Sequence, residues 1–249
     1  MNNKFFLNAL LIILFFTTLL AQPKEIIVND GLTIIPISHN SYRHISYVDY
    51  KGSKVPCNGL LYFNDNECLV VDTPISDSVS QELINWIREN KKVRIIGVVA
   101  THWHDDAAGG LQAFHNENIP SYSLEFTRDT LIIQNLPATQ NVFTDSMKIK
   151  VGNKFAELYY PGPGHVKDNI VVWFEDEKAL FGGCLVKEFK SNSIGYIGDA
   201  DLNNWDKTLA KVKTKFPEAK VVIPGHGDIG GLELIDKSIE IVVNYKNKN

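Results

Sequence analysis

Histidine, aspartate and cysteine are concentrated in four short segments of this sequence, where they could bind a metal ion. In residues 101–106 (THWHDD), His102 and His104 stand two residues apart, and the carboxylate of Asp106 follows two residues later. Two imidazoles and a carboxylate projecting from one turn offer nitrogen and oxygen ligands of the kind that zinc takes. This spacing alone is moderately specific, because three polar residues in an ordinary loop would also produce it.

Each of the other three segments carries one candidate ligand in a glycine-containing turn. These segments are residues 161–165 (PGPGH), 182–184 (GGC) and 224–227 (PGHG), which contain His165, Cys184 and His226. Glycine allows the backbone to turn sharply, and histidine nitrogen and cysteine sulfur are common zinc ligands. The three histidines outside the four segments are interpreted as ordinary polar or partly buried residues: His39, His44 and His115.

Every one of the four segments directly follows a run of residues that predicts a β-strand. The predicted strands are residues 93–100, 155–160, 179–181 and 221–223. The first of them (VRIIGVVA) is almost continuously apolar, which is typical of a strand buried on both faces. We therefore expect the candidate ligands at the C-terminal ends of strands.

The rest of the chain predicts an α/β fold. Helices are expected at residues 77–89, 106–115, 202–216 and 232–245. Further strands are expected at residues 25–28, 32–37, 42–48, 147–151 and 169–174, with a hairpin turning at 64–66. Strands followed by helices occur twice, so we expect one domain built as a four-layer αββα sandwich. Residues 46–56 are interpreted as a loop between strands that could move over a site.

The first residues predict a signal peptide. Lys4 precedes an apolar run over residues 5–20, and the small residue Ala21 closes it before a polar stretch. The alternative is an uncleaved membrane anchor, since the run is near the lower length limit for a spanning helix. We expect cleavage of residues 1–21, with residues 22–249 forming a periplasmic domain without stable membrane association.

Composition and cysteine content narrow the function classes. The hydrophobic content of 44% disfavours a disordered protein, and the net charge of −4 disfavours a nucleic-acid-binding protein, which would normally carry a basic stripe.

The number of cysteines is odd. Exported proteins often join their cysteines in disulfide bonds, but this sequence has three cysteines, so they cannot all pair with one another. In the predicted hairpin Phe63 lies near Cys68, and Cys57 lies further along the ladder, so these two are poorly placed to bridge. At least one thiol is therefore free.

These segments resemble the metallo-β-lactamase superfamily, and within it the β-lactamases whose second zinc is bound by Asp, Cys and His. The resemblance covers essentially the whole mature chain and is carried by VVDTP (70–74), THWHDD, GHVKDNIVVW (164–173), GGCLVK (182–187) and PGHGD (224–228). It implies a metallo-β-lactamase sandwich of two similar halves with two zinc ions per chain between them. The implied ligands are His102, His104 and His165 for one zinc, and Asp106, Cys184 and His226 for the other.

Several more positions gain implied roles from the same resemblance. Asp72 would brace the ligand loops by hydrogen bonds. Lys187 would pair with the substrate carboxylate, and residues 46–56 would be the flexible loop over the substrate, where Tyr47 and Tyr50 could give apolar contact. Tyr196 stands where the family often has an Asn that polarises the lactam carbonyl.

The implied reaction is hydrolysis of the β-lactam amide of penicillins, cephalosporins and carbapenems by a metal-bound hydroxide, which Asp106 could also orient, conferring antibiotic resistance. A related hydrolase of another ester, thioester or lactone is the main competing function. Ala107, where such enzymes usually have His, argues against it, together with Cys184 and Lys187. A non-catalytic zinc-binding protein and a closed structural zinc site are weaker possibilities. The expected partner is a small β-lactam, with the protein a monomer.

Overall fold

The computed structural model describes residues 24–248 except residue 51. The predicted signal peptide, residues 1–21, lies outside the described residues and stays a prediction. Within the described part of the chain, no helix is both long and apolar enough to cross a membrane.

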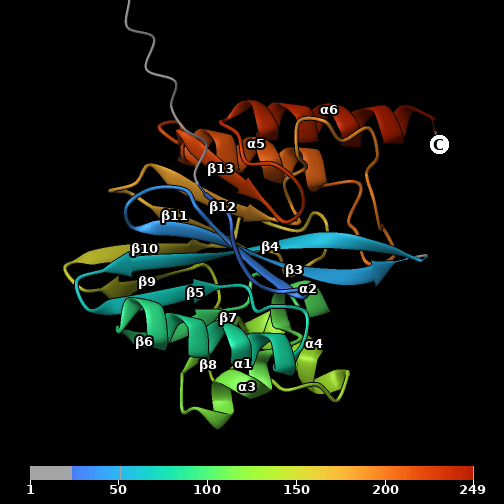
Figure 1. The fold of residues 1–249 in the computed structure, drawn as a ribbon. Coiled ribbons are helices and arrows are strands. Elements are labelled where there is room, and N and C mark those ends of the chain that lie inside the picture. The colour runs from blue at the N-terminus through green and yellow to red at the C-terminus, as the bar shows by residue number, and fades with distance from the viewer. Residues whose placement is uncertain (1–23, 51, 249) are drawn as a thin grey trace, which may run out of the picture.

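Two β-sheets form the centre of the molecule (Figure 1). The first follows chain order: β1 (Ile26–Asn29), β2 (Leu32–Pro36), β3 (Ser41–Tyr50), β4 (Ser53–Asn64), β5 (Glu67–Val71), β6 (Arg94–Val99), β7 (Ser121–Leu124) and β8 (Asn141–Phe143). The second has the order β13 (Val221–Pro224), β12 (Ala179–Gly183), β11 (Val171–Phe174), β10 (Lys154–Tyr159) and β9 (Ser146–Val151). Strands β5 to β8 are parallel, as are β12 and β13, while the other pairs are antiparallel.

Helices cover the outer faces of both sheets (Figure 1). On the first sheet lie α1 (Asp77–Trp86) with its π-helical extension η1 (Ile87–Lys91), α2 (Asp105–Ala108), α3 (Leu111–Asn116) and α4 (Glu125–Ile133). On the second lie α5 (Trp205–Lys215) and α6 (Glu233–Lys248). The four-layer αββα prediction is confirmed.

Alternation along the strands explains the layering. In β4, Leu60 and Tyr62 join the apolar layer between the two sheets, whereas Leu61 and Phe63 join the layer under α1 and α3. Successive side chains of a strand point to opposite faces, so one apolar strand supplies both layers. A third layer packs the second sheet against α5 and α6.

The hairpin turning at residues 64–66 is confirmed. Phe63 pairs with Cys68, as predicted, and Cys57 pairs with Ser46 on β3. All three cysteines lie in the described part of the chain and are free thiols.

Residues 46–56 are not the predicted loop. Strand β3 continues to Tyr50 and β4 begins at Ser53, with Val48 paired to Val55. Valine and tyrosine favour strands even among polar neighbours, and Gly52, with φ of 79°, permits the tight turn. The segment is therefore an extended hairpin.

Other boundaries also differ from the sequence interpretation. The helix expected at 106–115 is divided into α2 and α3 around Gly109 and Gly110. Residues 121–143 received no assignment from the sequence, yet they form β7, α4 and β8.

Candidate metal centre

The turns at the C-terminal ends of four strands bring all six predicted ligands together. His102 and His104 lie in the turn after β6, and Asp106 lies in the short helix α2 that follows it. The turns after β10, β12 and β13 carry His165, Cys184 and His226. The ligand atoms of His102, His104 and His165 lie within 4.8 Å of one another, as do those of His102, Asp106 and Cys184. The predicted ligands from both halves of the chain thus meet at one place.

The three histidines present nitrogen atoms to a common point. Nδ1 of His104 lies 3.3 Å from Nε2 of His165. On the other side of its ring, Nε2 of His104 donates to the Asp199 carboxylate at 3.0 Å. This bond places the proton on Nε2 and leaves Nδ1 free to bind a cation.

Asp106, Cys184 and His226 form a second group. The Cys184 Sγ atom lies 3.2 Å from Oδ2 of Asp106 and 3.4 Å from Nε2 of His226, and the last two atoms are 3.2 Å apart. Nδ1 of His226 donates to the Pro56 carbonyl oxygen at 2.8 Å, which leaves Nε2 facing the group. Carboxylate, thiol and imidazole together suit zinc.

Unsatisfied buried atoms indicate that the residues fit a metal. His102 Nε2 and Asp106 Oδ1 lie 3.2 Å apart, but neither atom has a hydrogen-bond partner among the described residues. Buried polar atoms are nearly always hydrogen-bonded, so orphaned atoms among crowded ligand-type groups require another explanation. A bound cation would satisfy both atoms.

Burial and neighbouring charges shift the pKa values of these groups. Burial opposes ionisation of Asp106, but His102 and His226 outweigh it and hold the Asp106 pKa well below its usual range. Burial, with the Asp106 charge, raises the pKa of the Cys184 thiol to about 11. A cation beside the sulfur would reverse that shift, because it stabilises the thiolate.

Asp72 holds the start of the ligand-bearing turn. Its carboxylate accepts hydrogen bonds from the Thr101 backbone N–H at 2.7 Å and from the Thr101 hydroxyl at 2.9 Å. Thr101 immediately precedes His102, so these hydrogen bonds agree with the bracing role that the family resemblance implies for Asp72. Burial raises the Asp72 pKa to about 7.

A pocket of about 470 Å³ opens over the candidate ligands. Its apolar wall comes from Val48, Val55, Ile75 and Trp103, and its polar wall includes His104, Asp106, His165, His226 and Lys187. Val48 and Val55 are the paired residues of the β3–β4 hairpin, which therefore borders the pocket. Tyr47, which the sequence suggested for this contact, does not line the pocket.

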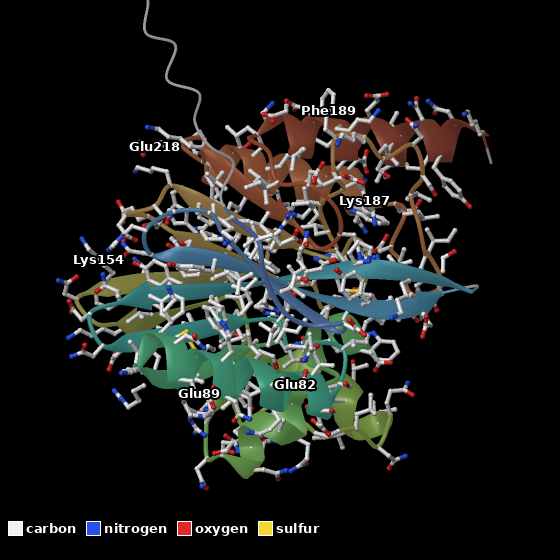
Figure 2. The ribbon with its side chains drawn as sticks, viewed as in Figure 1. Glu82, Glu89, Lys154, Lys187, Phe189 and Glu218 are labelled. Atoms are coloured by element: carbon white, nitrogen blue, oxygen red, sulfur yellow. The ribbon has the colours of Figure 1, made fainter. Side chains whose placement is uncertain are left out.

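Lys187 lies beside the metal centre without an acidic partner. It is half-buried, with Nζ 5.1 Å from the centre of the Trp205 ring, and it forms no ion pair with any described residue. Figure 2 shows Lys187 inward of the C-terminal helices, whereas Phe189 lies at their outer side. Burial lowers the Lys187 pKa, partly offset by Cys184 and Asp106.

Known proteins resemble this chain over nearly its whole length. A protein from Bacteroides fragilis named Metallo-beta-lactamase type 2 is 38% identical over 237 residues, 95% of each chain. A protein of the same name from Elizabethkingia meningoseptica is 31% identical over 212 residues, 85% of each chain. The family described as Metallo-beta-lactamase superfamily matches residues 52–124.

The chain belongs to the metallo-β-lactamase superfamily. A solved metallo-beta-lactamase from Pontibacter korlensis superposes with a TM-score of 0.84 and 33% identity, covering 86% of this chain and 100% of that one. The expected metallo-β-lactamase sandwich is therefore confirmed, and membership of the superfamily implies bound metal ions.

Tyr196 departs from the pattern that the superfamily resemblance suggests. Its ring meets the His104 ring edge-on, with centres 5.7 Å apart, and the residue is half-exposed at the pocket. A Cβ atom at Gly198 would lie 2.2 Å from the Tyr196 hydroxyl, so glycine at 198 makes room for the phenol. The hydroxyl lies against the Gly198 backbone.

Three residues near the candidate ligands were not predicted as site residues from the sequence: Cys57, Trp103 and Asp199. Trp103 stands between His102 and His104 in the sequence, and that position could have indicated a place at the site. Asp199 is 95 residues from His104 and lies in no ligand-like pattern. The Cys57 thiol lies within 4.8 Å of ligand atoms of Asp106 and His226, although the sequence placed it only in a hairpin.

Proposed function

We propose that this protein is a zinc-dependent β-lactamase that hydrolyses the amide bond of penicillins, cephalosporins and carbapenems and so confers antibiotic resistance. The decisive observation is that the two candidate ligand groups converge beside Lys187, which forms no ion pair with any described residue. The chain is also 38% identical to a metallo-β-lactamase along its length. A lysine in that position suits a substrate that carries a carboxylate.

Two zinc ions per chain are proposed. One would be held by His102, His104 and His165, and the other by Asp106, Cys184 and His226. When bound, zinc supplies a Lewis acid for the lactam carbonyl and makes water acidic enough to attack near neutral pH.

The side chains around the metals position the substrate and the water. The second oxygen of Asp106, which has no hydrogen-bond partner in the structure, can accept a hydrogen bond from the attacking water and orient it. Lys187 pairs with the substrate carboxylate. Trp103, Val48 and Val55 cover the apolar body of the substrate and exclude water from it.

Hydrolysis assays on purified protein test this function. Nitrocefin and imipenem should be hydrolysed, chelation should abolish turnover, and added zinc should restore it. His165→Ala should remove activity, whereas the matched control His39→Ala, at an exposed histidine outside the pocket, should not. Hydrolysis of thioesters or lactones, with no turnover of either β-lactam, would instead support the competing hydrolase function.

Export to the periplasm is also proposed, with residues 1–21 removed and residues 22–249 acting as a monomer. The charge at Lys4, the apolar run after it and the small residue Ala21 support this. N-terminal sequencing of periplasmic protein should begin at Gln22. An intact N-terminus in the membrane fraction would indicate an anchor instead.

A further inference from the structure

We propose that Cys57 is a second thiolate ligand of the second metal site, beside Cys184. The site would then offer four protein ligands, with Asp106 and His226 as the other two. This inference rests on the proposed second zinc site and specifies its ligand chemistry.

The geometry of a separate candidate group carries the proposal. Cys57 Sγ, a carboxylate oxygen of Asp106 and a ring nitrogen of His226 lie within 4.8 Å of one another. Cys184 contacts the same two residues, at 3.2 Å and 3.4 Å. Two thiols therefore share one carboxylate and one imidazole.

Hydrogen bonds on both sides of Cys57 hold it against the turn that carries His226. The Pro56 carbonyl accepts from Nδ1 of His226 at 2.8 Å. Asn58 donates to three carbonyl oxygens within residues 224–227 at 2.8–2.9 Å, one from its backbone and two from its side-chain amide. The position of the Cys57 thiol relative to His226 is thus set by the strand and not by a flexible loop.

Cys57 differs from the cysteine that has a purely structural environment. Cys68 is fully buried in the apolar layer under α1 and α3. Cys57 is also buried, with 2% exposure, but it belongs to none of the three apolar clusters formed by the described residues, and neither does Cys184. Cys57 thus shares two neighbours, Asp106 and His226, with Cys184, and its thiol otherwise contacts the Val55 carbonyl oxygen at 3.6 Å.

The donor set has a chemical consequence. One oxygen, one nitrogen and two sulfurs are all ligand types that zinc takes, and each thiol would lose its proton on binding. Two soft thiolates should also favour thiophilic metals such as cadmium more strongly than one does.

Cobalt substitution counts the thiolates directly. Co²⁺ is titrated into metal-free parent protein, Cys57→Ala, Cys184→Ser and the double variant, and thiolate-to-cobalt charge-transfer absorbance is read at two cobalt ions per chain. Each single variant should retain about half of the parent absorbance, since each keeps one thiolate, and the double variant should lose the band. Cys68→Ala is the matched control and should match the parent.

Two results would overturn the inference: parent-like absorbance in Cys57→Ala, or complete loss of the band in Cys184→Ser. If Cys57→Ala failed to fold, the absorbance of Cys184→Ser would decide alone, because only Cys57 could supply the remaining thiolate of that variant.

Nitrocefin turnover of the zinc-loaded parent is measured in parallel. Turnover with a one-thiolate spectrum contradicts only this inference, whereas absent turnover contradicts the proposed function.

Discussion

At the scale of single residues, Lys187 is the group best placed to bind a substrate carboxylate. Lys187→Glu should raise KM for imipenem about tenfold or more with a smaller change in kcat, because an attraction made in both ground and transition states becomes a repulsion. Steady-state kinetics on several β-lactams measure this. The nearby exposed Lys190, paired with Asp228 outside the pocket, provides the control Lys190→Glu. An unchanged KM in Lys187→Glu would remove Lys187 from the substrate site.

Replacing Tyr196 by Phe tests whether its phenol hydroxyl assists the reaction. Because that hydroxyl lies against Gly198 and the ring contacts His104, Tyr196→Phe keeps the ring contact and should change kcat/KM by less than about threefold. Steady-state kinetics measure kcat/KM of the parent and of Tyr196→Phe, with the metal content of both proteins determined in parallel. A loss of about 100-fold, the scale for removing an oxyanion-hole donor, would make Tyr196 catalytic.

At the scale of elements, His44 ties the β3–β4 hairpin to the end of β5. It pairs with Gly59 across the hairpin, where a Cβ atom would lie 2.1 Å from its ring, and its Nε2 donates to the Asp72 carbonyl oxygen at 3.1 Å. The sequence analysis interpreted His44 as an ordinary polar or partly buried residue, whereas the structure buries it completely beside the bracing carboxylate. Burial lowers its pKa from 6.5 to about 4.

The depressed pKa of His44 predicts a pH-dependent stability. The unfolded chain takes up the proton near pH 6.5 and the folded chain only near pH 4, so the contribution is complete above pH 6.5 and is lost as pH falls toward 4. The loss should total roughly 3 kcal/mol over that window. Urea unfolding of chelated parent and chelated His44→Gln at several pH values measures this contribution as the difference between the two profiles, because the raised pKa of Asp72 acts in the opposite direction in both proteins. The advantage of the parent over His44→Gln should shrink as pH falls from 6.5 toward 4, and a difference that stays constant with pH would contradict the assignment.

At the scale of the whole molecule, the metal centre joins the two halves of the sandwich. His102 and Asp106 follow a strand of the first sheet, whereas His165, Cys184 and His226 follow strands of the second. A metal held between them binds only the folded arrangement. The metal should therefore stabilise folding as well as supply the chemistry.

Metal removal should lower the melting temperature. A ligand present at a thousandfold excess over its Kd adds about 4 kcal/mol, which for a chain of this size is a shift of roughly 10 °C. Calorimetry with zinc and with chelator compares the two forms. His165→Ala should show a smaller zinc-dependent shift, and equal melting of the parent in both conditions would contradict a metal shared by the halves.

The sequence alone predicted the layers of the fold, which the structure confirms, and the six candidate ligands, which the structure brings together. Apolar runs followed by amphipathic stretches, glycine-containing turns after predicted strands, and the spacing of His102, His104 and Asp106 are local features, and local backbone preferences act on them directly. The resemblance carried by those segments then implied the pairing of ligands into two groups, and the structure brings the same residues together.

Only the tertiary structure decided which distant residues complete the site. Asp199 accepts a hydrogen bond from His104, which lies 95 residues away in the sequence. The Pro56 carbonyl oxygen accepts one from His226, which lies 170 residues away. The β3–β4 hairpin, the burial of His44 and the approach of Cys57 to the second site all depend on how strands pair and sheets pack. Such contacts leave no periodicity or spacing in the chain, because they are set by the packing of elements and not by neighbours in sequence.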